Sequence, residues 1–273
     1  MFAVCGAAMA QSPAVSGDVD GDGECTTSDV TALYNYLLFD DGSAMVNGDQ
    51  NGDGYITVND VTWVYNILLN LPQDEHEYVD LGLPSGTQWA TMNIGASSPE
   101  DYGDYFAWGE TAPKSVYDWS TYKWCEGSYD TLTKYCFNSS YGYNGFVDNL
   151  TELDPDDDAA TAAWGAEWRM PSLEQIMELI INCTSEWTTR NGVTGFLFTS
   201  NINGASLFLP AAGYRWDSEL YDAGSYGYYW SRPLNGGGPY YANYLDFNSV
   251  DAYWSYHSRN YGQSVRAVRV SQN

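Results

Sequence analysis

The chain has 273 residues, of which 44% are apolar and 16% aromatic, enough for a hydrophobic core in one large or two ordinary domains. Its 36 Asp and Glu outnumber 10 Lys and Arg, which gives a formal net charge of −26. Nucleic acid and anionic membrane surfaces are not expected as partners, because both are bound through clustered basic side chains. A membrane-spanning segment is not expected either, since no stretch approaches the roughly 20 apolar residues that one needs.

The first ten residues are apolar and end in Ala8-Met9-Ala10. This small-x-small pattern, followed by polar residues, is typical of the cleavage site of a secretory signal peptide. We therefore expect residues 1–10 to be a signal-peptide remnant and the protein to be secreted or held at the cell surface.

The cysteines leave the redox state open. No two of them form a Cys-x-x-Cys pair, so neither a zinc ribbon nor a thioredoxin-like motif is indicated. In an oxidising compartment a disulfide can form within the set Cys125, Cys136 and Cys183, but the sequence does not choose the pair. Buried free thiols are the alternative.

An internal repeat dominates the N-terminal part of the chain, from residue 1 to residue 77. The segment 18–29 (DVDGDGECTTSD) is matched in register by the segment 49–60 (DQNGDGYITVND). The stretch 1–77 carries 13 acidic residues and no lysine or arginine. Because this stretch has no positive charge of its own, metal cations are the expected countercharge.

The repeat has the spacing of a calcium loop. Calcium takes about six to eight oxygens, which such a loop supplies from positions 1, 3, 5, 7 and 12, with a glycine at position 6 for the sharp turn. Gly23 and Gly54 stand at that position, so two Ca²⁺ ions are predicted. The expected ligands are Asp18, Asp20, Asp22, Glu24 and Asp29 in the first loop and Asp49, Asn51, Asp53, Tyr55 and Asp60 in the second.

The loops differ from an ordinary EF-hand, which has Glu at position 12 and a helix before the loop. Here position 12 is Asp, and a glycine precedes each loop. Paired loop–helix units of this kind resemble the type I dockerin module over residues 17–70, within a domain that we place at residues 14–71. The resemblance implies a small all-α module that is folded by calcium and docks onto a cohesin partner.

The resemblance also implies where such a partner binds. The recognition positions of the family, 10 and 11 of each loop, correspond to Thr27-Ser28 and Val58-Asn59. The first pair suits the family pattern, whereas the second departs from it. A calcium-stapled spacer without any cohesin partner is the alternative for this segment.

Apolar periodicity and turn signals place elements on both sides of a short polar linker at residues 72–77. Ser172 and Gln175 form a capping box at the start of one helix, and a second helix is expected over residues 158–164. Residues 207–210 and 228–231 read as strands, so residues 78–273 are expected to form one α+β domain. The stripes expected to be buried are Val30, Leu33, Tyr34 and Leu37 after the first loop, and Leu173, Ile176, Met177 and Ile180 after the capping box.

Five phrases in this domain carry a second resemblance. They are residues 78–90, 101–110, 164–172, 208–215 and 262–268. Over residues 78–270 the chain is similar to the Fibrobacter succinogenes major paralogous domain, common on exported proteins of gut bacteria. That family is related to the fold of formylglycine-generating enzymes, so the resemblance implies a C-type lectin-like fold.

The chain lacks the metal ligands of the catalytic members of that group. Formylglycine-generating enzymes hold copper with two C-terminal cysteines, and no cysteine follows Cys183. Related sulfoxide synthases need a histidine cluster, but the only histidines are His76 and His257. We therefore expect a domain that is not an enzyme. A related oxidase and a structural surface stalk are the alternatives.

Residues 221–261 have the composition of a binding surface. Ten Tyr, two Trp and one Phe alternate there with Asn, Ser, Asp and Gly, the mixture that antibody binding loops use. Within residues 243–248, alternation predicts a strand that buries Leu245 and Phe247 on one face and exposes Tyr244 and its neighbours on the other face. A glycan or a surface protein is the expected ligand. The residues expected to face it are Tyr240, Tyr241, Asn243, Tyr244, Asp246, Asn248, Asp251, Tyr253, Tyr256 and His257.

Overall fold

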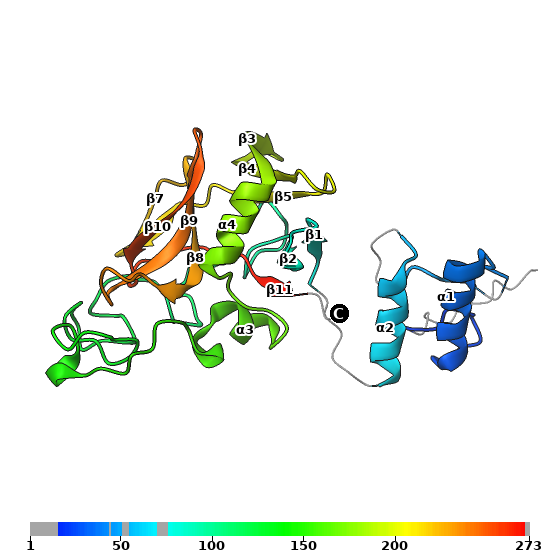
Figure 1. Cartoon of the computed structure of the whole chain (residues 1–273), viewed down its shortest axis with the longest axis horizontal. Coiled ribbons are helices and arrows are strands. Elements are labelled where there is room, and N and C mark those ends of the chain that lie inside the picture. Colours follow the sequence, from blue (N-terminus) through cyan, green and yellow to red (C-terminus); the bar gives the residue numbers. More distant parts are fainter. Residues whose placement is uncertain (1–15, 44, 51–54, 70–75, 271–273) are drawn as a thin grey trace, which may run out of the picture. The chain divides into compact units, whose positions relative to one another are not determined.

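The computed structural model describes residues 16–43, 45–50, 55–69 and 76–270. The expected signal segment at residues 1–10, the second-loop ligands Asn51 and Asp53, and residues 72–75 of the expected linker lie outside the described residues. The chain divides into two compact units, one up to residue 75 and one from residue 76 onward (Figure 1).

The N-terminal unit is built from two helices, α1 (Thr27–Phe39) and α2 (Val58–Leu68). Each begins with the same capping box. The hydroxyl of Thr26 or Thr57 accepts a hydrogen bond from the first turn, while the carboxylate of Asp29 or Asp60 accepts one from the N-cap backbone. These bonds satisfy N–H groups that have no partner inside a helix. The prediction of a helix after each loop is therefore confirmed.

The helices share a small apolar core. Its fully buried members are Val19, Val30, Ala32, Leu33, Val61 and Val64. Of the stripe predicted for α1, Val30 and Leu33 are buried and Leu37 packs against them, but Tyr34 is 41% exposed. The prediction was wrong for Tyr34 because the buried face is centred on Asp29, Ala32 and Leu33, where α1 also covers the loop that Asp29 closes.

The C-terminal unit combines four small antiparallel sheets with short helices (Figure 1). The helices are η1 (Tyr143–Gly145), η2 (Pro155–Asp157), α3 (Ala159–Trp164) and α4 (Leu173–Asn182). The strands are β1 (Tyr78–Asp80), β2 (Thr87–Ala90), β3 (Cys183–Arg190), β4 (Val193–Ser200), β5 (Ser206–Pro210), β6 (Tyr214–Trp216), β7 (Glu219–Tyr221), β8 (Tyr226–Leu234), β9 (Tyr241–Asn248), β10 (Ala252–Ser258) and β11 (Val268–Val270).

Strand order explains how this unit closes on itself. The sheets run β1-β2-β11, β10-β9-β8, β3-β4-β5 and β6-β7, and β2 pairs with both the first and the last strand of the unit. The guanidinium of Arg269 lies 3.7 Å from the ring centroid of Tyr78, which fastens the two ends further. The expected strands at residues 207–210 and 228–231 are part of β5 and β8, so the predicted mixture of helices and strands is confirmed.

Both helices predicted in this unit are present. Asp158 caps α3, and Ser172 and Gln175 form the capping box of α4. Of the stripe predicted for α4, Ile176 is buried and Ile180 packs against the core, but the prediction was wrong for Met177, which is 40% exposed. The covered face runs through Gln175, Ile176 and Leu179 instead, since the Gln175 side chain donates a hydrogen bond of 2.9 Å to the hydroxyl of Thr87.

A long, mostly irregular segment between β2 and α3, green in Figure 1, covers one end of the β8–β10 sheet. The fully buried side chain of Arg259 fastens part of it. Its guanidinium lies over the rings of Trp108 and Tyr122, with ring centroids 5.6 and 5.2 Å away. Carbonyl oxygens accept its other hydrogen bonds, at 2.7 Å from Lys134, 2.8 Å from Pro239 and 2.9 Å from Tyr135.

Candidate functional sites

The first loop brings together three carboxylates. Oxygens of Asp18, Asp20 and Asp22 lie within 4.8 Å of one another, the single such metal-capable cluster in the part of the chain that the structure describes. Asp18 accepts hydrogen bonds from the backbone N–H groups of Gly21 (2.7 Å) and Gly23 (3.0 Å), which folds the loop around it. Three hard oxygen donors at this spacing fit a calcium ion.

Asp29, the expected ligand at position 12, is fully buried at the start of α1. One carboxylate oxygen accepts hydrogen bonds from the backbone of Val19 (2.7 Å) and Asp20 (3.1 Å), and the other accepts one from Thr26 (2.7 Å). Asp29 therefore ties the loop to the helix that follows it. It is not one of the three clustered carboxylates, so its coordination of calcium stays a prediction, as does that of Glu24 through its backbone oxygen.

The second loop repeats this scaffold at the start of α2. Asp60 is fully buried and accepts hydrogen bonds from the backbone of Gln50 and Thr57, each at 2.8 Å, as Asp29 does from Val19 and Thr26. Asp49 is half-buried and Tyr55 exposed. Because Asn51 and Asp53 are outside the described residues, the second set of ligands stays a prediction.

Gln50 connects the two loops, a role that the sequence did not predict. The side-chain oxygen of Gln50 accepts a hydrogen bond of 2.9 Å from the backbone of Gly17, and its amide donates one of 2.8 Å to the carbonyl of Asn47. The repeat gave no signal for this role, because the equivalent position in the first loop is Val19. The two loops are thus connected by a side chain that breaks the internal symmetry.

The four residues predicted to meet a docking partner are all exposed: Thr27, Ser28, Val58 and Asn59. They occupy the first turns of α1 and α2. The side chain of Val58 is 65% exposed, and nothing in the helix core requires an apolar residue there. Their accessibility is compatible with docking but does not test it.

Comparison with known protein families decides the class of this segment. Residues 16–69 match the dockerin type I domain. Domains of this type generally bind calcium, and the carboxylates of the first loop lie within the matched segment, which is called the dockerin region below. No curated protein and no solved structure matches the chain.

In the C-terminal unit, the structure corrects the predicted exposure of β9. Leu245 and Phe247 are buried as expected, but Tyr244, Asp246 and Asn243 are also at least 94% buried. The reason is that β9 is the middle strand of its sheet and both of its faces are covered. Around Tyr244 the covering rings are those of Tyr228, Trp230 and His257, with centroids 5.6, 5.9 and 6.0 Å away.

His257 lies in the same layer. Its ring packs against Tyr261 and Tyr214, with centroids 4.3 and 5.6 Å away. Burial lowers the pKa of His257 to about 4, so the imidazole is neutral near pH 7. His257 is half-buried, so it is less exposed than predicted, and its part in ligand binding stays a prediction.

The remaining members of the predicted set stay accessible in two groups. Asp251, Tyr253 and half-buried Asn248 surround the β9–β10 turn, and Tyr253 is 41% exposed. The other group is a row of rings along the irregular segment and β10. In this row the Tyr240 centroid lies 4.9 Å from Tyr141 and 4.2 Å from Tyr241, which is in turn 5.1 Å from Tyr256.

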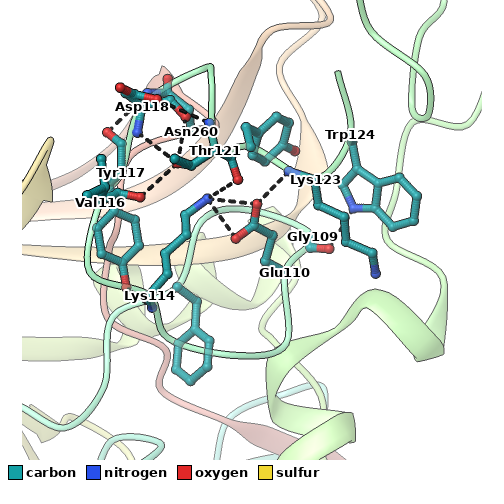
Figure 2. Close-up of polar contacts among 12 residues, drawn as sticks. Gly109, Glu110, Lys114, Val116, Tyr117, Asp118, Thr121, Lys123, Trp124 and Asn260 are labelled. Carbon is teal, nitrogen blue, oxygen red and sulfur yellow. Dashed lines mark hydrogen bonds and ion pairs between the residues drawn. The ribbon is translucent and has the colours of Figure 1, made fainter. Parts of the chain in front are cut away.

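A partly buried ion pair organises the loop between residues 109 and 124 (Figure 2). The Lys114 ammonium lies 2.9 Å from the Glu110 carboxylate and donates a hydrogen bond of 3.0 Å to the carbonyl of Thr121. Glu110 also accepts a bond of 2.8 Å from the backbone of Lys123. Both charged groups form their ion pair and hydrogen bonds within the loop, so these contacts stabilise the loop's conformation.

The cysteines of the described residues are free thiols: Cys25, Cys125, Cys136 and Cys183. Of the two alternatives left open by the sequence, the structure therefore has thiols in place of a disulfide. Burial raises the pKa of Cys183 to about 11, so it is a protonated core residue at neutral pH. In the part of the chain that the structure describes, no helix has both the length and the apolar character to cross a membrane.

Proposed function

We propose that this is an exported, non-catalytic binding protein. Its dockerin region, ordered by two calcium ions, docks onto a cohesin-like partner at a surface or scaffold. Its C-terminal unit, a C-type lectin-like domain by resemblance, presents an aromatic surface to a glycan or protein ligand. The observation that carries the docking role is the convergence of Asp18, Asp20 and Asp22 in a segment that matches the dockerin type I domain.

Calcium supplies the positive charge that the dockerin region lacks. Asp18, Asp20 and Asp22 would hold the first ion with Asp29 closing the shell, and the equivalent second-loop residues would hold the other. Asp29 and Asp60 support this arrangement, because each ties its loop to its helix through the same hydrogen bonds. Ion binding and helix formation are therefore expected to be coupled.

The partner is expected at the first turn of α1. Thr27 and Ser28 offer two exposed hydroxyls, whereas Val58 and Asn59 offer a methyl surface and one amide. The two pairs occupy equivalent positions of the repeat, so they form a matched comparison. A spacer role predicts that neither pair contributes to binding.

Binding of the full chain to immobilised type I cohesin domains tests the docking role. In calcium we expect binding that EGTA abolishes. The double variant Thr27→Ala/Ser28→Ala should weaken it at least tenfold, and Val58→Ala/Asn59→Ala should change it less than threefold. If no cohesin binds a chain whose helicity rises with calcium, the spacer role replaces docking.

The non-catalytic role of the C-terminal unit is supported by its titratable groups. The cysteine pair and the histidine cluster that hold metal in the related enzymes have no counterpart, because no cysteine follows Cys183 and the sequence has only two histidines, and the charges of the Glu110–Lys114 pair are engaged with each other. A turnover assay with copper or iron separates this role from that of a related oxidase. Reproducible metal-dependent oxidation would overturn it, whereas a stalk predicts neither turnover nor ligand binding.

A further inference from the structure

A groove of about 620 Å³ lies on the C-terminal unit. Three parts of the chain form it: β3, the turn that enters β8, and the β9–β10 turn with the start of β10. Its lining residues are Trp187, Gly224, Ser225, Tyr226, Asn248, Ser249, Val250, Asp251 and Tyr253. Only Asn248, Asp251 and Tyr253 belong to the ligand-facing set predicted from the sequence.

The lining combines aromatic rings with small polar groups. Trp187, Tyr226 and Tyr253 each come from a different strand. Between them stand one carboxylate (Asp251), one carboxamide (Asn248) and two serine hydroxyls. Rings offer flat apolar surfaces, while carboxylate and amide groups accept and donate several hydrogen bonds at fixed geometry. Sugar rings present this same pattern, with C–H faces and rims of hydroxyl groups.

The aromatic side chains are held in place by their neighbours. The Tyr226 ring is stacked on Tyr228 with centroids 5.8 Å apart, and the Trp187 ring contacts Phe196 at 6.0 Å. Tyr253 is paired with Asp246 across the β9–β10 ladder. Side chains that are already ordered lose little conformational entropy on binding, so such a surface binds a ligand at low cost.

The charge around the groove selects among sugars. No lysine or arginine lines it, and Asp251 stands in its wall. Behind the wall, Asp222 accepts a hydrogen bond of 3.1 Å from Tyr228, and Asp246 is 94% buried with one carboxylate oxygen that has no hydrogen-bond partner among the described residues. A carboxylated or sulfated glycan would meet uncompensated negative charge here.

We infer that this groove binds a short uncharged oligosaccharide, stacked on Trp187, Tyr226 and Tyr253 and hydrogen-bonded by Asn248 and Asp251. This rests on the proposed binding role of the C-terminal unit, and it specifies the site and the ligand class. Of the residues assigned to the ligand, Trp187 and Tyr226 are outside the ligand-facing set predicted from the sequence.

An array of neutral hexasaccharides (mannose, xylose, glucose and N-acetylglucosamine backbones) tests this with the full chain in calcium. Carboxylated and sulfated forms of the same backbones form the second arm. We expect at least one neutral backbone to bind, and its charged forms to bind at least tenfold more weakly at low salt. Tyr253→Ala should reduce binding at least tenfold. Tyr143→Ala is the matched control, because Tyr143 is 46% exposed but lies in η1 outside the groove.

Near-UV circular dichroism of each variant shows whether the aromatic packing is intact, and Tyr253→Phe provides a milder change in case Tyr253→Ala does not fold. Absence of binding to every neutral backbone, or stronger binding to charged forms, would overturn the ligand class. Neutral binding that survives Tyr253→Ala would overturn the groove as its site while leaving the binding role of the unit intact. A surface-protein array, read separately, reports on that broader role.

Discussion

The two units of this protein differ in their supply of positively charged side chains. The stretch 1–77 contains 13 acidic residues and no basic ones, so all ten lysines and arginines belong to the C-terminal unit. That unit buries Arg259 and Arg266 completely and places backbone carbonyls, an amide oxygen and aromatic rings around them, although Nε of Arg259 and one terminal nitrogen of Arg266 have no hydrogen-bond partner among the described residues. The dockerin region has no lysine or arginine, so we expect it to take up cations from solution, whereas the C-terminal unit contains ten cationic side chains beside its acidic ones.

Removal of calcium should separate the two units most clearly. In EGTA we expect α1 and α2 to lose their helicity, while the near-UV spectrum of the aromatic C-terminal unit stays unchanged. At calcium concentrations about a thousand times the Kd, each bound ion stabilises the folded state by about 4 kcal/mol. Calorimetry with and without calcium measures this as one thermal transition that moves and one that does not.

Single carboxylates sharpen the same comparison. Asp18→Ala removes a clustered carboxylate and should lower the calcium affinity of the first loop. Asp40→Asn is the matched control, because Asp40 is the exposed left-handed C-cap of α1, a conformation that asparagine tolerates. If both variants changed the calcium titration equally, net charge rather than loop geometry would be responsible.

Loss of the Arg259 side chain should destabilise the C-terminal unit, whereas loss of calcium should destabilise the dockerin region. Arg259→Met leaves the carbonyls of Lys134, Tyr135 and Pro239 without this donor, which we expect to cost about 3–5 kcal/mol of unfolding free energy in the C-terminal unit. The transition of the dockerin region should not move. Arg190→Met is the control. Arg190 is the last residue of β3, and its guanidinium lies over the Phe208 ring. This contact should contribute less than about 1 kcal/mol to the free energy of unfolding. Urea unfolding followed by tryptophan fluorescence measures both.

Local patterns were the part of this structure that the sequence could predict. The repeat determined the positions of α1 and α2, and the Ser172–Gln175 box determined the start of α4. These signals depend on residues within one turn of each other, so no knowledge of distant segments was needed. The clustering of Asp18, Asp20 and Asp22 followed from loop spacing for the same reason.

Exposure was harder to predict, because it depends on what lies opposite. Alternation along β9 correctly separated Leu245 from Tyr244 but gave no sign that the second face is covered too. The groove shows the same limit. Trp187 is far from Tyr253 in the sequence, and only the packing of β3 near the β9–β10 turn brings them to one site.

His257 gives the two units different pH responses. Burial lowers its pKa in the folded chain to about 4, below the 6.5 of an exposed histidine, so the unfolded chain takes up the proton first. Stability is therefore lost as pH falls through about 6.5 and levels off below about 4. Between pH 7 and pH 5 the loss should be on the order of 2 kcal/mol.

His257→Gln should remove this part of the acid sensitivity of the C-terminal unit. The other histidine, His76, is unchanged in this variant and serves as an internal control, and the dockerin region contains no histidine. Urea unfolding of both proteins at several pH values measures the difference. An identical pH slope in the two proteins would show that groups other than His257 cause the acid response.

The smallest expected change in stability concerns two glycines, one just before the first loop and one within it. Gly17 and Gly23 both have left-handed φ angles, +87° and +94°, so alanine is strained at either position. At Gly23 no atom of the described residues, apart from its chain neighbours, lies within 4 Å of an added Cβ, whereas at Gly17 an added Cβ would overlap the Cys25 sulfur. Gly17→Ala should therefore destabilise the calcium-loaded dockerin region by about 1 kcal/mol more than Gly23→Ala. Adding Cys25→Ala to Gly17→Ala should recover most of that difference, because the added methyl would then occupy the space of the sulfur. If the double variant recovered no stability, backbone strain alone would account for the destabilisation caused by Gly17→Ala.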